Sequence, residues 1–185
     1  MLFMYDKIFL YMARSMVLGN GNMMVCLDKF GQLRDLYFPY VGSENHIGQN
    51  QTHKIGIFVD GGISWLDSGE WHTDISYENG SMVGSVKTSN NNRGLYIETQ
   101  DVVYNEKNIF LRKLILKNKS DRQRKIKIFL NQQFKISDNN HADTAYFSGA
   151  IQSIVHYKGR RVFLVGGLCD NRPFEEYSIG FCGIE

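Results

Sequence analysis

The chain has 185 residues, of which 43% are hydrophobic and 13% aromatic, so it is long enough for one domain with a real core and is not a disordered protein. The formal net charge of +2 lacks the excess that attracts nucleic acid or acidic membranes. No run of about 20 apolar residues occurs, which excludes a membrane-spanning helix. The three cysteines, Cys26, Cys169 and Cys182, fit no zinc spacing, and we expect reduced thiols in a cytoplasmic protein.

The first residues resemble a signal peptide only faintly, because Asp6 and Lys7 interrupt their apolar stretch and no small-residue cleavage site follows. Met12 is an alternative start. We therefore expect residues 1–12 to be an N-terminal extension and residues 13–185 to form the domain.

Short runs of β-branched and aromatic residues between turn residues predict strands in the first half of the chain. Asp60-Gly61-Gly62 and Asn79-Gly80 supply the positive-φ residues of tight hairpin turns. The expected strands in this half are residues 23–27, 32–38, 54–59, 63–66, 74–78 and 81–88.

From Leu95 to Gln100, apolar and polar residues alternate with the period of two that a half-buried strand requires. The later expected strands are residues 109–116, 125–136, 150–157 and 161–168, and residues 177–183 also have the character of strand and turn. No window of a dozen residues keeps a helical stripe between caps. The sequence thus predicts an all-β fold, an antiparallel two-sheet β-sandwich of about a dozen strands.

Several common sites are not supported by their spacing. Gly19-Asn20-Gly21 lacks the third glycine of a dinucleotide loop and fits a turn. No histidine pair has metal-binding spacing, and His141 with Asp143 fits a solvated loop. The basic clusters at residues 122–127 and 158–161 fit solvated strand ends better than phosphate contacts. We predict no metal, no cofactor, and no nucleic-acid or membrane partner.

Carbohydrate chemistry is the one chemistry that the sequence favours. Sugars present flat C–H faces and rings of hydroxyls, which aromatic rings and Asp, Glu, Asn or His side chains complement. The candidates are Tyr37, Phe38, Tyr40, Glu44, Asn45 and His46, with Trp65 and Trp71 as secondary aromatic candidates. A structural alternative stays open, in which Tyr37 and Phe38 alternate between core and solvent and Trp65 anchors the core.

Residues 16–46, MVLGNGNMMVCLDKFGQLRDLYFPYVGSENH, resemble the N-terminal domain of glycoside hydrolase family 15, the prokaryotic glucoamylases, glucodextranases and trehalase-type enzymes. The likeness is carried by Gly19-Asn20-Gly21, by Arg34 to Pro39 and by Gly42-x-Glu44-Asn45-His46. It continues through Ile55 to Gly61, Trp65 and Gly166-Gly167.

The resemblance implies a supersandwich of the galactose mutarotase-like type that precedes an (α/α)6 barrel. In the family, two barrel glutamates hydrolyse α-glucosidic bonds with inversion, their carboxyls roughly 6.5–9.5 Å apart. Twelve helices need roughly 130 residues, for which this β-rich chain has no room. We therefore expect no catalytic residue here, an inactive isolated chain, and a domain truncated at its C-terminus.

The expected function is that of a non-catalytic N-terminal domain of a glucan 1,4-alpha-glucosidase (glucoamylase)-like glycoside hydrolase. The domain would scaffold the barrel, with the loop 42–46 projecting toward the barrel or its sugar rim. The expected partners are the barrel and, through it, an α-glucan or trehalose; maltooligosaccharide, dextran-type glucan and trehalose stay open. We expect the isolated domain to self-associate through an apolar patch or a sandwich edge. The alternatives are a stand-alone carbohydrate-binding module using exposed aromatics and a nucleic-acid-binding β-domain.

Overall fold

The computed structural model describes residues 14–48, 51–139 and 141–180, and within them every regular element except one 3-10 helix is a strand. The predicted extension, residues 1–12, lies outside these ranges. The elements are β1 (Met16–Gly19), β2 (Met24–Leu27), β3 (Leu33–Tyr37), β4 (Lys54–Val59), β5 (Gly62–Trp65), β6 (His72–Tyr77), β7 (Gly84–Asn90), β8 (Leu95–Val103), β9 (Phe110–Asn118), β10 (Lys127–Asn131), η1 (Ile136–Asp138), β11 (Thr144–Ser148), β12 (Ser153–Lys158), β13 (Arg161–Val165), β14 (Leu168–Cys169) and β15 (Arg172–Pro173).

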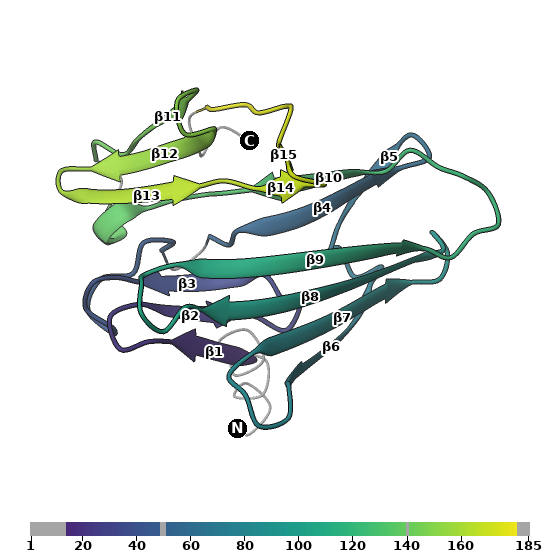
Figure 1. The fold of residues 1–185 in the computed structure, drawn as a ribbon, viewed down its shortest axis with the longest axis horizontal. Helices are drawn as coiled ribbons and strands as arrows, with labels where there is room; N and C mark the ends of the chain where they lie inside the picture. Colours follow the sequence, from purple (N-terminus) through teal and green to yellow (C-terminus); the bar gives the residue numbers. More distant parts are fainter. Residues whose placement is uncertain (1–13, 49–50, 140, 181–185) are drawn as a thin grey trace, which may run out of the picture.

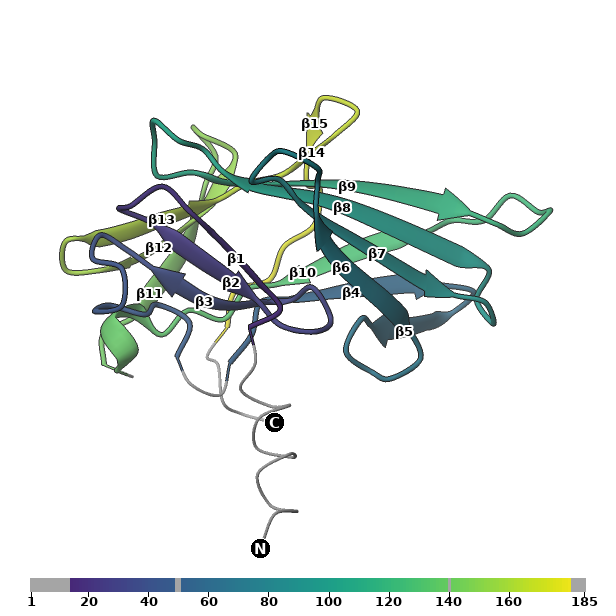
Figure 2. The same ribbon diagram turned by 90° about the horizontal axis from the view of Figure 1, so that it is seen from below.

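The strands form two packed layers, with a smaller sheet at one end (Figure 1). One layer is the sheet β6-β7-β8-β9; the other combines the sheets β1-β2-β3 and β10-β4-β5, which a bridge between Leu33 and His53 connects. In Figure 2, β8 and β9 lie above β4 and β10. Every pairing between the strands is antiparallel. The predicted all-β antiparallel sandwich is confirmed.

Strand β8 shows how the period of two builds the core. Its residues alternate strictly between buried and half-buried, so one face points into the sandwich. Leu95 and Ile97, at its start, pack with the β4–β5 side, and Val103, at its end, packs with β1–β3. The first cluster comprises Met16, Leu18, Met23, Val25, Leu27, Leu33, Leu36, Ile47, Val86 and Val103. The second cluster comprises Ile55, Ile57, Val59, Leu66, Trp71, Leu95 and Ile97.

A buried ion pair joins β8 to the neighbouring strand β9, at a position between the two apolar ends of β8. Asp101 has no exposed surface, and Arg112 of β9 donates to its carboxylate at 2.6 and 2.9 Å. The same guanidinium donates to the carbonyl of Gly31 at 2.9 Å, in the turn between β2 and β3. Arg112 therefore connects the two layers at a point where apolar packing is interrupted.

The structure extends and corrects the expected strands. β1 and β11 were not expected, because Met16–Gly19 and Thr144–Ser148 are too short to show a periodicity. The single strand expected at residues 125–136 is wrong: it ends at Asn131, and the chain turns away toward η1. β10 pairs with β4 instead of β9, so residues 119–126 cross between layers. Residues 177–180 form no strand, and 181–183 lie outside the described ranges.

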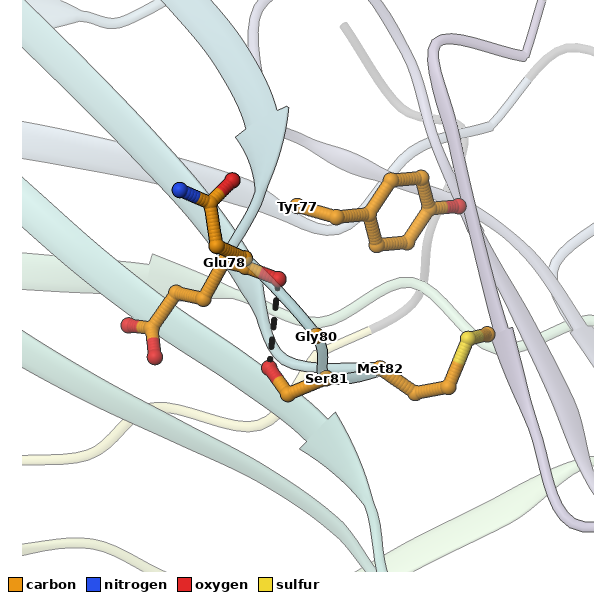
Figure 3. Close-up of a pocket in the computed structure, with 6 residues that line it drawn as sticks. Tyr77, Glu78, Gly80, Ser81 and Met82 are labelled. Carbon is orange, nitrogen blue, oxygen red and sulfur yellow. Dashed lines mark hydrogen bonds between the residues drawn. The ribbon is translucent and has the colours of Figure 1, made fainter.

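The outer edge of β1 is closed by a side chain from the opposite layer. The N–H of Val17 donates to the hydroxyl oxygen of Tyr77, and that hydroxyl donates to the carbonyl of Val17, both at 2.8 Å. Figure 3 shows the Tyr77 ring beside the β6–β7 turn, where the Ser81 hydroxyl donates to the Glu78 carbonyl at 3.4 Å. An edge strand is thereby satisfied without a further strand.

Among the described residues, the structure contains no helix with the length and apolarity needed to cross a membrane.

Candidate functional site

The predicted sugar-binding stretch begins where β3 ends, and its backbone folds back on itself. Tyr37, the last residue of β3, forms an isolated bridge with Asn45, so residues 38–44 make a closed loop. The Asn45 side chain accepts from the N–H groups of Leu36 and Ile47 at 3.2 and 3.1 Å and donates to Asp35 at 2.9 Å. Asn45 therefore supports the loop from within.

His46 fixes the loop from its buried side. It has no exposed surface. Its Nδ1 accepts from the N–H of Ser137 at 3.1 Å, so the ring proton is on Nε2, which donates to the carbonyl of Phe38 at 2.5 Å. Burial lowers the pKa of His46, which keeps the ring neutral. In this position His46 orients the loop and presents no edge to a ligand.

Glu44 connects the loop to the β11–β13 sheet. Arg161, at the start of β13, donates to both carboxylate oxygens at 2.8 and 2.6 Å. This bidentate pair lowers the pKa of Glu44 and raises that of Arg161. We expected residues 42–46 to project toward a separate barrel. In the structure, Glu44 of this loop is bound to the β11–β13 sheet of the same chain. At the loop tip, Tyr40 is 63% exposed and Val41 42%.

Beneath this attachment lies a cluster of aromatic side chains, which we call the ring junction. Its members are Phe38, His46, His53, Phe134, His156 and Phe163. Phe163 of β13 is central: its ring centroid lies 4.7 Å from that of His46 and 5.2 Å from that of Phe134. Phe38 is therefore part of the packing between the loop and the β11–β13 sheet.

The other two histidines of the ring junction are also held neutral. His53 contacts the Gln133 carbonyl at 3.1 Å through Nε2, and its burial lowers its pKa to about 3. Burial also lowers the pKa of His156, whose ring lies 4.3 Å from that of Phe134. Since the described residues contain no group of three His, Cys, Asp or Glu side chains arranged for a metal ion, packing is the role that the geometry gives these histidines.

The two tryptophans differ in burial: Trp71 precedes β6 and lies in the core, whereas Trp65 ends β5 and is half-buried. Trp71 is 6% exposed, belongs to the second core cluster, and donates its Nε1–H to Ser64 at 2.9 Å. The register of β4 and β5 places Trp65 on the outer face of its sheet. Of the two, Trp65 is the one positioned for a ligand.

Trp65 has neighbours that the sequence interpretation missed. Gly56 of β4 pairs with Trp65 on one side and with Phe129 of β10 on the other, so the three residues form a row across the sheet. Phe129 is 39% exposed. The sequence did not indicate that Phe129 lies on an outer face, because the strand that pairs with β10 could not be predicted from the charged residues at 125 and 127.

The β11–β13 sheet has a second apolar face, opposite to the ring junction. Cross-strand pairs place Leu164, Val155 and Tyr146 in one row and Val162 and Tyr157 in the next. Only Val155 is buried; Leu164 is 61% exposed and Val162 52%. We call this surface the outer β11–β13 face. A small sheet that is apolar on both sides is typical of an element covered by a partner.

Open depressions occur beside the β6–β7 turn (Figure 3) and next to Glu70, His72 and residues 89–92. Several members of the two basic clusters form ion pairs within the chain: Arg122 and Arg124 contact Asp60, and Arg161 contacts Glu44. The Cys26 thiol is buried, which raises its pKa to about 11 and makes it unreactive.

The described residues form an antiparallel β-sandwich with exposed aromatic and apolar faces. No family model matches the sequence, and no solved structure matches it. The chain is similar to a curated protein of Methanocaldococcus jannaschii named "Uncharacterized glycosyl hydrolase MJ1610", with 24% identity over 152 residues. The match covers 81% of this chain and 23% of that relative, so the chain spans about a quarter of its length. The chain is thus related to a glycosyl hydrolase.

Proposed function

We propose that this chain is the non-catalytic N-terminal domain of a glucoamylase-like hydrolase of glycoside hydrolase family 15, and that it holds the catalytic (α/α)6 barrel. The relationship to a glycosyl hydrolase, the sandwich fold and the family-like residues 16–46 support this assignment. The match to only a quarter of a longer relative agrees with a domain that works beside another.

The outer β11–β13 face is the observation on which the proposal depends most. Tyr146, Tyr157, Val162 and Leu164 leave 38–61% of their surface exposed on one small sheet. Apolar surface of this kind is stabilised when a second domain removes it from water. The exposed loop tip at Tyr40 and Val41 is connected to the same sheet through Glu44 and Arg161. We propose that this tip extends the docking surface toward the sugar site of the barrel.

The test begins with the protein from its source cells. An antibody to this chain is used to isolate it, the intact mass is measured, and glucose release from maltoheptaose, dextran and trehalose is assayed. We expect release from one of the three with inverted anomeric configuration, seen by NMR, and none from the 185-residue chain alone. No release from any substrate, or release with retained configuration, would contradict the proposal.

Docking is tested by substitution in the same setting. The double variant Val162→Asp, Leu164→Asp places charges on the outer β11–β13 face and is expected to lose the co-purifying glucosidase activity. The matched control is Lys113→Asp, because Lys113 is an exposed residue of β9, outside the β11–β13 sheet. This variant is expected to retain the glucosidase activity. Equal activity in both preparations would contradict docking at this face.

A further inference from the structure

The outer face of the β10-β4-β5 sheet carries an aromatic surface that the core does not use. Ile55, Ile57 and Val59 of β4 point inward. The residues between them therefore point outward, with their cross-strand partners. Phe129, Gly56 and Trp65 form the middle row, and Lys127, Phe58 and Ile63 form the next. We call Phe58, Ile63, Trp65 and Phe129 the Trp65 platform.

The indole of Trp65 lies face-on against the backbone of Gly56. A Cβ at Gly56 would stand 2.8, 2.9 and 3.2 Å from three ring atoms, Cε3, Cζ3 and Cδ2. Nearly equal distances to three atoms of one ring mean that its plane faces that point. The absence of a side chain at Gly56 thus allows the ring to lie flat, with its second face directed away from the sheet.

Covering a glycine with a cross-strand aromatic stabilises a sheet by itself, and this accounts for the inner face of Trp65. It does not account for the exposed neighbours, because Phe129 and Ile63 leave 39% and 44% of their surface in solvent on the same face. Neighbouring strands are about 4.8 Å apart, so Trp65 and Phe129, two strands apart, are separated by about 10 Å.

Hydrogen-bonding groups flank the aromatic row. On one side, Lys54 pairs with Asp67 at 2.8 Å, next to Asn131. On the other, Lys127 contacts both carboxylate oxygens of Glu176 at 2.8 and 3.1 Å. Each ion pair is partly exposed and keeps both donors and acceptors available at the edge of the apolar row. If an apolar protein surface bound here, these four charged groups would lose their contact with water without gaining new hydrogen bonds. A ligand with hydroxyl groups can instead form hydrogen bonds with them.

We propose that the Trp65 platform binds a glucan chain. Glucose carries its ring hydroxyls equatorially, which leaves C–H groups on both faces of the ring to stack on Trp65 and Phe129. The hydroxyls at the ring edge then reach Lys54, Asp67, Lys127 and Glu176. The platform is separate from the outer β11–β13 face, so the domain can hold a polysaccharide and a partner domain at once. This inference does not depend on the glucoamylase assignment.

Native gel electrophoresis of the 185-residue chain tests the proposal, with soluble starch, dextran or hydroxyethyl cellulose cast into the gel. We expect at least one glucan to retard the chain. Trp65→Ala and Phe129→Ala are each expected to weaken the retardation about tenfold in apparent Kd. Tyr104→Ala, an exposed aromatic next to the end of β8, is the matched control and should migrate as the parent does.

Two further measurements exclude misfolding as the explanation. Circular dichroism identifies variants that fail to fold, and Phe129→Ala leaves the contact between Trp65 and Gly56 in place. The variant Trp71→Phe leaves Trp65 as the only tryptophan, and its emission should change with maltoheptaose, dextran oligosaccharide or cellohexaose.

The proposal is overturned if no glucan retards the chain, or if Trp65→Ala and Phe129→Ala both migrate as the parent does. Equal loss of retardation in Tyr104→Ala would also overturn it. The glucoamylase proposal is decided separately, by inverting glucose release from the isolated native protein. Each proposal can therefore fail while the other stands.

Discussion

Two regions bury apolar surface in this molecule with different chemistry. The sandwich core consists mainly of aliphatic side chains, such as Leu27, Ile57 and Ile97. The ring junction consists of phenylalanine and histidine rings around Phe163 and attaches the β11–β13 sheet to that core. Aliphatic packing does not change with pH, whereas a buried imidazole can gain a proton. The attachment of the small sheet should therefore be the pH-sensitive part of the fold.

The largest effect is expected within the sandwich, at Arg112. Arg112→Ala leaves the Asp101 carboxylate buried without its partner and the Gly31 carbonyl without its donor. Removal of one member of a buried pair costs about 3–5 kcal/mol. Denaturant unfolding should show this loss, with Lys113→Ala as the exposed control on the same strand. A loss no greater than that of the control would mean that the core does not depend on the pair.

The next largest effect is a pH dependence of stability, which should arise in the ring junction and not in the sandwich core. His53 has a folded pKa of about 3, below its ordinary 6.5, and burial also lowers the pKa of His46 and His156. The contribution of the neutral His53 ring to stability is complete above pH 6.5. It is lost as the pH falls toward 3, because the unfolded chain then binds protons that the folded chain excludes. The slope should reach about 1.4 kcal/mol per pH unit for His53.

Unfolding free energies between pH 7 and 4 measure this slope. His53→Gln, which stays neutral throughout, should flatten the profile. His72→Gln is the matched control, because His72 lies on the exposed strand β6 and should leave the slope unchanged. A profile that is equally steep in both variants would remove His53 as its cause.

Phe163→Ala should weaken the ring junction without damaging the sandwich. The half-buried ring packs on His46 and Phe134, and its loss should cost about 2 kcal/mol, less than a fully buried phenylalanine. Hydrogen exchange should accelerate in β11–β13 and stay slow in β7 and β8. Leu164→Ala, on the exposed face of the same strand, should cost less than about 0.5 kcal/mol. Uniform acceleration would mean that the two regions unfold as one.

Glu44→Gln should give the smallest change. It replaces the charge that Arg161 binds, at a partly exposed site where such pairs contribute little to global stability. The local effect should be visible, because the loop helps to place His46, whose Nδ1 accepts from Ser137. Amide exchange of Ser137 should accelerate, with Glu98→Gln as control. Unchanged exchange at Ser137 would show that His46 alone holds the loop.

Local patterns predicted the fold well where each strand carried its own signal. Asp60 and Gly61 do adopt positive φ in the β4–β5 turn, and the alternation from Leu95 to Gln100 continues through β8. The pairing of β10 with β4 could not be predicted, because it depends on residues 119–126 crossing between layers, which no local pattern encodes.

The site was harder to predict than the fold, for a related reason. Residue type identified Trp65 and Trp71 equally. Only the structure shows that Trp71 packs in the second core cluster and that the register of β4 and β5 places Trp65 on the outer face. The same holds for Phe129, which becomes a neighbour of Trp65 through Gly56. His46 was selected for its polarity, yet its position between Phe38 and Ser137 gives both ring nitrogens internal partners.

The hydroxyl of Tyr77 occupies both backbone groups of Val17 that a further strand would use. One phenol group thus satisfies the middle of the β1 edge. In Tyr77→Phe the edge would become a free template, and two such edges from separate molecules could pair into a continuous sheet. A single oxygen atom therefore bears on whether this protein stays dispersed at high concentration or assembles into fibres.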